Sequence, residues 1–108
     1  MVERIEAAGA RHGLRIGTFG HAGDGNLHPT VVLADSSEDA VARAHRAFEE
    51  IFEAAIALGG TITGEHGVGL AKLPYLERRL GAEHVALLRR IKSAFDPQGI
   101  LNPGKLGS

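Results

Sequence analysis

Cysteine and tryptophan are absent from the 108 residues, and tyrosine occurs only once. Without cysteine the chain cannot carry a disulfide scaffold, a cysteine–zinc fold, an iron–sulfur cluster or a cysteine nucleophile. No apolar run approaches the ~20 residues that span a bilayer, and the first residues lack the apolar core of a signal peptide. We therefore expect a soluble, cytoplasmic protein with no membrane span, which a complex could still bring to a membrane.

The chain also lacks an excess of positive or negative charge, because 12 basic and 13 acidic residues leave a net charge of −1. With so few aromatic residues, this balance gives no electrostatic or stacking signature for nucleic acid. The length fits one small domain with a modest core. Glycine, by contrast, is abundant: the 15 glycines are about twice the average share of ~7%.

The first half of the chain predicts a helix, a hairpin and a second helix. Residues 2–12 have helical periodicity, and Gly13 is a plausible stop. Residues 14–19 and 27–34 alternate or run apolar as strands do, and the turn-rich segment between them predicts an antiparallel hairpin. Apolar residues then recur at helical spacing after an N-cap at Ser36 or Ser37, namely at Val41, Ala44, Phe48, Ile51, Phe52, Ala55 and Leu58.

The second half predicts an extended stretch at residues 61–63 and two further helices. The first helix runs over residues 70–80 with an interruption near Pro74. The second runs over residues 83–95, with Val85, Leu88, Ile91 and Phe95 facing inward, and stops at Pro97; the tail is a loop. We therefore predict an α+β fold, in which helices pack on one face of a small antiparallel sheet.

Two glycine clusters share the spacing G-x-x-G-x-G, at Gly20, Gly23 and Gly25 and again at Gly64, Gly67 and Gly69. The dinucleotide-binding fingerprint has the order G-x-G-x-x-G between a strand and a helix. Neither cluster matches that order, and the lysine of a phosphate-binding loop is missing as well. A phosphate cradle is therefore a weak interpretation of either cluster.

Residues able to bind a metal ion stand in both clusters. On the predicted hairpin, His21 and His28 flank the loop, and directly opposed residues there have Cβ atoms ~4.5–5.5 Å apart. Glu65 of the second cluster could add a carboxylate, which would complete a set typical of a catalytic metal site. Asp24 and Asn26 could cap the turn or hold a ligand imidazole. The alternative is that the clusters are only tight turns, and we assign no role to the remaining histidines outside them, His12, His45 and His84.

Three longer runs, TFGHAGDGNLHP, GGTITGEHGVG and IKSAFDPQGILNPGK, occur in this order and cover most of residues 14–105. Together they resemble the C-terminal part of FAD-linked 2-hydroxyacid dehydrogenases, within the vanillyl-alcohol oxidase superfamily. That group contains glycolate oxidase D subunits, D-lactate dehydrogenases and D-2-hydroxyglutarate dehydrogenases. We therefore read residues 1–108 as the substrate and metal side of such an enzyme.

The resemblance implies a role for each matching position. His21, His28 and Glu65 would bind a divalent ion, usually zinc in this family. His66 would be the catalytic base over the substrate, and Asn102 would lie near the FAD. The implied reaction oxidises a D-2-hydroxy acid to the 2-oxo acid, with the hydroxyl proton going to His66 and the hydride to the flavin.

Two departures from the family refine this expectation. Hydroxyglutarate-type members tend to have asparagine two residues after the second metal histidine, whereas Thr30 follows Pro29 here, which favours glycolate or D-lactate as substrate. The FAD-binding domain, which precedes this region in the family, is not recognisable in the sequence. We expect a C-terminal fragment that alone holds no FAD, shows no turnover and self-associates as a homo-oligomer through uncovered apolar residues such as Val31, Leu33, Ile100 or Leu101.

The missing flavin domain leaves two alternatives open. The chain could be a non-catalytic metal-binding or ligand-binding module. It could also be a subunit that completes a flavoenzyme in trans, with the FAD-binding domain in another chain. A neighbouring reading frame that encodes an FAD-binding domain would favour a fragment or a subunit over the module.

Overall fold

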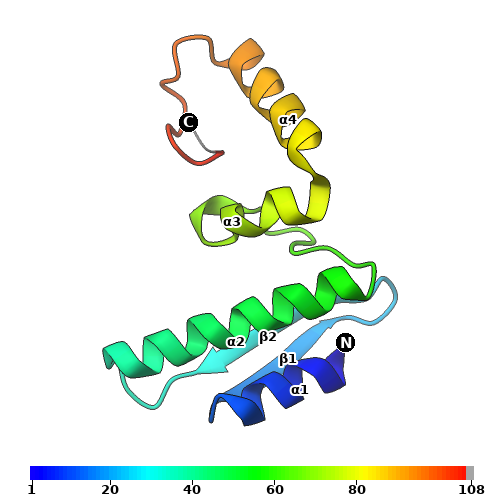
Figure 1. Ribbon diagram of the computed structural model, residues 1–108, viewed down its shortest axis with the longest axis vertical. Helices are drawn as coiled ribbons and strands as arrows, with labels where there is room; N and C mark the ends of the chain where they lie inside the picture. Colours follow the sequence, from blue (N-terminus) through cyan, green and yellow to red (C-terminus); the bar gives the residue numbers. More distant parts are fainter. Residues whose placement is uncertain (107–108) are drawn as a thin grey trace. The chain divides into compact units, whose positions relative to one another are not determined.

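The computed structural model describes residues 1–106, and the chain divides into two compact units, of which the first is Met1–Gly64 and the second begins at Glu65. The first unit holds α1 (Val2–Arg11), β1 (Arg15–His21), β2 (Asn26–Val32) and α2 (Glu38–Ala57). The second holds α3 (Gly69–Leu80) and α4 (Ala82–Phe95) (Figure 1).

The first helix ends where its sequence predicts. Gly13 has a φ of +62°, in the left-handed region that glycine adopts without strain. Its N–H donates to the Ala10 carbonyl at 3.2 Å, and the N–H of Leu14 donates to the Gly9 carbonyl at 2.8 Å. The chain thereby reverses directly from α1 into β1.

The predicted antiparallel hairpin is confirmed, and its two faces have different neighbours. Arg15 pairs with Val32 at one end, and His21 pairs with Asn26 beside the loop. Because side chains alternate along a strand, Ile16 and Leu27 share one face. These two side chains pack against the core formed by α1 and α2, whose buried members are Ile5, Ala8 and Ile51.

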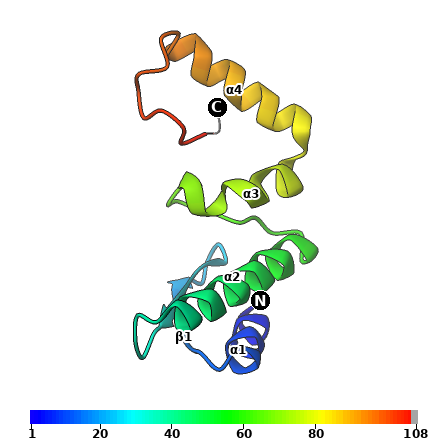
Figure 2. The same ribbon diagram turned by 60° about the vertical axis from the view of Figure 1, so that its left-hand side comes forward.

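Both helices of the first unit therefore cover the same face of the hairpin, as the α+β prediction requires. The two views show α1 and α2 beside the hairpin (Figures 1 and 2). Glu50 of α2 accepts from Arg11 and lies 3.2 Å from the His12 Nε2, and Arg43 Nη1 donates to the Gly13 carbonyl at 3.3 Å. These polar contacts hold the end of α1 against α2.

The start and end of α2 follow the prediction, but its buried face is partly different. Ser37 is the N-cap, and its Oγ accepts from the Ala40 N–H at 3.2 Å. Val41 and Leu58 remain 38% and 58% exposed, which contradicts their predicted inward position. The buried stripe is made mostly of small residues, Ala40, Ala44, Ala47 and Ile51. Small side chains let α2 approach its neighbours closely, so the bulkier residues fall at the edges of the stripe.

The extended stretch at residues 61–63 does not pair as a strand within the described part of the chain. Ile62 is nevertheless buried, at 5% exposure, and anchors this connection. The predicted interruption at Pro74 is also wrong, since α3 runs through it. Pro74 is the sixth of the twelve residues of α3, so the helix continues without the hydrogen bond that an N–H at this position would donate to the Leu70 carbonyl.

Helix α4 confirms the predicted range but not the whole predicted inward face. Val85 is buried at 5% exposure, whereas Ile91 is 47% and Phe95 82% exposed. With only α3 packed against it in the second unit, α4 buries one end of its apolar stripe and leaves the other uncovered. Among residues 1–106 no helix combines the length and apolar character that crossing a membrane requires.

The tail after α4 is a loop over residues 96–106, as predicted, while Gly107 and Ser108 lie outside the described residues. Asp96 organises it, which the sequence pattern did not reveal. Its buried carboxylate pairs with Lys92 and accepts from the N–H groups of Ile100 at 3.0 Å and Leu101 at 2.9 Å. The Lys92 hydrogen bond, aided by those two N–H groups, holds the pKa of Asp96 below its ordinary value despite burial.

Candidate metal centre

The two predicted histidine ligands stand beside the hairpin loop, but they are not directly opposed. His21 pairs with Asn26, and His28 pairs with Phe19. The two histidines are therefore diagonal neighbours on one face of the hairpin, and their ring centroids lie 5.7 Å apart in an edge-to-face arrangement. Diagonal neighbours remain within reach of large side chains, so the predicted proximity holds although the predicted register was wrong.

This histidine face is the one turned away from the core. Ile16 and Leu27 point toward the helices. The opposite face of the hairpin carries His21, His28 and Phe19. Phe19 is 65% exposed and its ring centroid lies 5.4 Å from that of His28. One face of the hairpin thus packs on the core, and the other carries the two histidines and Phe19.

The loop between the strands is fixed by short-range hydrogen bonds. The N–H of Gly25 donates to the His21 carbonyl at 3.0 Å, and Gly25 itself has a φ of +73°. Asp24 Oδ1 accepts from the Asn26 N–H at 2.9 Å. Of the two roles predicted for Asp24, the structure shows the cap of the turn.

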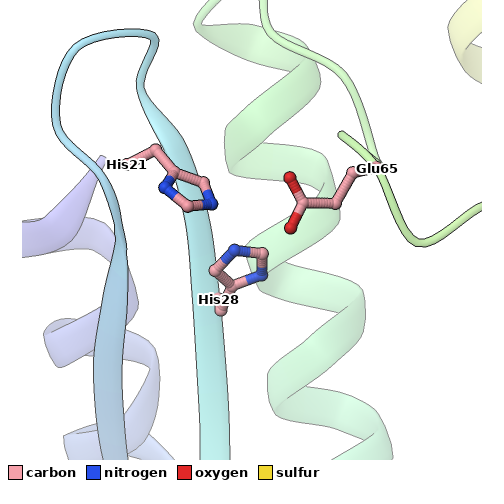
Figure 3. Close-up of side chains that lie close together, drawn as sticks. All are labelled: His21, His28 and Glu65. Atoms are coloured by element: carbon pink, nitrogen blue, oxygen red, sulfur yellow. The ribbon is translucent and has the colours of Figure 1, made fainter.

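Glu65 supplies the third candidate ligand. One ring nitrogen each from His21 and His28 and one carboxylate oxygen from Glu65 lie within 4.8 Å of one another. Figure 3 shows the two rings and the carboxylate directed toward a common space. His28 is half-buried, and the other two side chains are exposed. Glu65 directly follows Gly64, the last residue of the first unit.

The donor set fits a divalent ion such as zinc. Imidazole nitrogen and carboxylate oxygen are both zinc ligands, with bond lengths of about 2.0–2.2 Å. Donors on one tetrahedral ion are therefore about 3.4 Å apart, a separation that small side-chain rotations would produce from the present spacing. Three protein ligands leave a fourth position for water or substrate, which is typical of catalytic rather than structural zinc.

His66, the predicted base, follows Glu65 in the same loop. Its Nε2 lies 3.6 Å from Glu65 Oε1, and its side chain is 68% exposed. Asn102 lies instead in the loop after α4, where it adopts a φ of +46°.

The two glycine clusters stand between elements that differ from those of a usual dinucleotide-binding turn. The first glycine cluster connects two antiparallel strands, and the element directly before the second is the helix α2 rather than a strand. A pyrophosphate site of the usual kind needs a strand, a glycine-rich turn and a helix in succession. Neither cluster supplies that succession in the described part of the chain.

Comparison with known proteins agrees with this α+β fold. The family model described as "FAD linked oxidases, C-terminal domain" matches residues 1–106. The chain belongs to this family. Both compact units lie within that single match.

Curated relatives of the chain are much longer. It is 55% identical over 106 residues to glycolate oxidase subunit GlcD of Bacillus subtilis, which covers 98% of this chain and 23% of the relative. It is 46% identical over 86 residues to the mitochondrial cytochrome-type D-lactate dehydrogenase of Arabidopsis thaliana, covering 80% and 15%. GlcD of Escherichia coli K12 is 35% identical over 105 residues, covering 97% and 21%. The chain thus spans less than a quarter of each relative.

Proposed function

We propose that this chain forms the metal and substrate side of an FAD-linked oxidoreductase that converts a short D-2-hydroxy acid, glycolate or D-lactate, to the 2-oxo acid. The observation that carries the proposal is the convergence of His21, His28 and Glu65 on one point. Relatives named for glycolate oxidation and D-lactate dehydrogenation support the substrate class.

His21, His28 and Glu65 would hold the divalent ion. When bound, such an ion supplies Lewis-acid stabilisation of an oxygen that becomes negatively charged. The two histidines are presented by a hydrogen-bonded hairpin rather than by a free loop, so their relative placement is largely set before any ligand arrives.

His66 would accept the proton of the substrate hydroxyl. An imidazole changes its protonation near neutral pH, which suits it to remove a proton and later release it to solvent. Its exposed position beside Glu65 gives it access both to substrate and to water. FAD, the family's electron acceptor, supplies the two-electron oxidation; the rest of a longer protein or a second chain would hold it, and Asn102 is the proposed contact from this side.

The segment after His28 favours a short substrate. Thr30, which follows Pro29, stands where hydroxyglutarate-type members of the family tend to have an asparagine. A larger dicarboxylate would lose that polar partner, whereas a two- or three-carbon hydroxy acid does not need it. This supports glycolate and D-lactate over hydroxyglutarate.

A chimera tests the function directly. The matching 106 residues of Bacillus subtilis GlcD can be replaced by this chain, and the oxidation of glycolate, D-lactate and D-2-hydroxyglutarate compared. We expect turnover of the two short acids and little of the third. A folded, flavin-containing chimera that oxidises none of them would support the non-catalytic module instead.

A further inference from the structure

We propose that Asn26 is a positioning residue that fixes the backbone carrying Glu65, and so sets the third ligand of the candidate metal centre. The proposal rests on the metal site described above. It assigns to Asn26 a task different from holding a ligand imidazole.

The carboxamide of Asn26 occupies the space that a side chain at position 64 would need. A Cβ atom on Gly64 would lie 2.4 Å from Asn26 Oδ1, 2.6 Å from its Cγ and 2.7 Å from its Nδ2. Real Cβ contacts are essentially never this short. The main chain at Gly64 is therefore in direct contact with the Asn26 side chain, and both residues belong to the first unit.

Asn26 is itself held in place by the hairpin. Its N–H donates to Asp24 Oδ1 at 2.9 Å, and it pairs with the ligand His21 in the strand register. A Cβ on Gly20 would lie 2.1 Å from the Asn26 carbonyl oxygen and 3.0 Å from Leu27 Cα. Asn26 thus offers a fixed surface next to one ligand.

The first glycine of each cluster is explained by its contact with Asn26. Gly20 begins the first cluster and packs on the backbone of Asn26, while Gly64 begins the second and packs on its side chain. One asparagine therefore lies between the two clusters. Each needs glycine at its first position because a side chain there would strike Asn26.

The chain just before Gly64 is also held in place. Ile62 is buried at 5% exposure, two residues before it. Between this apolar anchor and the Asn26 contact the backbone has little freedom, and Glu65 is the next residue along the chain. Its carboxylate would otherwise have to be ordered when a metal ion binds, at the expense of affinity.

Affinity for zinc, measured on the full chain by competition with a chromogenic chelator, tests the proposal. Asn26→Ala removes the contact, and Gly64→Ala forces the two groups apart. We expect each to weaken zinc binding by roughly tenfold to a hundredfold, the range seen when groups that orient metal ligands are removed. In Asn26→Ala/Gly64→Ala the added methyl fills the vacated space, so we expect weaker binding than wild type but no further loss beyond Asn26→Ala.

Gly23→Ala is the matched control. It adds a methyl group in the same hairpin loop, where nothing lies within 4 Å of the new Cβ, and its affinity should equal that of wild type. With Co²⁺ as a spectroscopic probe, the visible absorption of Asn26→Ala should shift toward that of Glu65→Ala. The proposal would be overturned if Asn26→Ala kept the zinc affinity and the Co²⁺ spectrum of wild type. It would also be overturned if Gly64→Ala lowered zinc affinity by the same factor in wild type and in Asn26→Ala.

Hydrogen exchange without metal separates this proposal from the metal site. In Asn26→Ala the backbone amides of residues 61–66 should exchange faster than in wild type, while those of α1 keep their protection. If wild type binds no zinc, the proposed metal site is wrong. Hydrogen exchange of residues 61–66 then tests by itself whether Asn26 positions the backbone. Unchanged exchange over residues 61–66 would contradict it.

Discussion

His21 and His28 lie diagonally across the hairpin, with their ring centroids 5.7 Å apart, because His21 pairs with Asn26 and His28 with Phe19. The arrangement places both imidazoles on the strand face opposite the core and leaves a cross-strand partner beside each. Phe19 is next to one ring, and Asn26 is next to the other. Ligand placement therefore depends on strand register as well as on residue type.

Moving an imidazole along the strand should abolish the site without changing the composition. In His28→Thr/Thr30→His the histidine stays on the same face but moves about 6.6 Å away from the loop, given a rise of roughly 3.3 Å per residue. We expect zinc affinity to fall as far as in His28→Ala. Calorimetric titration checks this, and retained binding would mean that the donors are not selected by their position.

Loss of His66 should affect turnover and leave the fold intact. In the chimera with Bacillus subtilis GlcD, His66→Ala should lower kcat by about 100-fold to 10,000-fold, the usual contribution of a general base. Flavin absorbance and thermal stability should match the parent chimera, because the side chain is 68% exposed. His84→Ala, an exposed histidine of α4, is the control. A His66→Ala chimera with most of its activity would remove this residue from the mechanism.

The core of the first unit should be sensitive at Ile5. This side chain is 1% exposed and packs with Ala8 and Ile51. Ile5→Ala should lower the free energy of unfolding by about 2–5 kcal/mol, the usual result of removing a buried aliphatic group. Leu58→Ala, at a site that is 58% exposed, should change it by less than about 0.5 kcal/mol. Urea denaturation followed by circular dichroism measures both, and similar values would contradict the described core.

The loop after α4 should loosen in acid. The pKa of Asp96 is lowered in the folded chain, so its contribution is present above the unfolded value and is lost as pH falls through the folded value. The amide resonances of Ile100 and Leu101 should therefore titrate together, with a midpoint below 3.8. Asp96→Asn should abolish this transition. A midpoint at or above 3.8 would show that Lys92 does not stabilise the carboxylate.

Exposed apolar side chains in the second unit predict self-association of the chain, and glycine clusters without the usual strand–turn–helix order predict that it retains no flavin. Phe95, Ile100 and Leu101 are 82%, 68% and 59% exposed and line one shallow hollow. Val31 does not belong to this set, because it pairs with Ile16 and is half-buried. Light scattering should give a mass above that of a monomer, and Phe95→Ser/Leu101→Ser should lower it. A monomeric wild type, or a yellow one, would contradict the expectation.

Local signals predicted most of the fold because they act over a few residues. The Ser37 cap, the Gly13 stop and the strand alternation each specify their own element. Burial depends on what packs against an element, so the exposure of Ile91 and Phe95 could not be inferred from helical spacing. Pro74 shows the same limit, because proline disfavours a helix interior locally and yet α3 runs through it.

The sequence predicted which residues of the candidate site lie close together, but not the contacts that support them. His21, His28 and Glu65 have side chains whose chemistry identifies them, and a resemblance to a family named them as well. The register that makes the histidines diagonal is set by the loop hydrogen bonds of Asp24 and Gly25. The contact between Asn26 and Gly64 joins residues 38 positions apart and has no signature in either cluster alone.

Calorimetric titration of the metal-free chain with zinc tests the metal centre most directly. The titration compares wild type with His28→Ala and with His45→Ala, a variant of an exposed histidine of α2. Wild type and His45→Ala should bind one equivalent of zinc with the same affinity, and His28→Ala should bind at least about 100-fold more weakly because a direct ligand is lost. Equal binding by wild type and His28→Ala, or no binding by wild type, would contradict a metal centre at His21, His28 and Glu65.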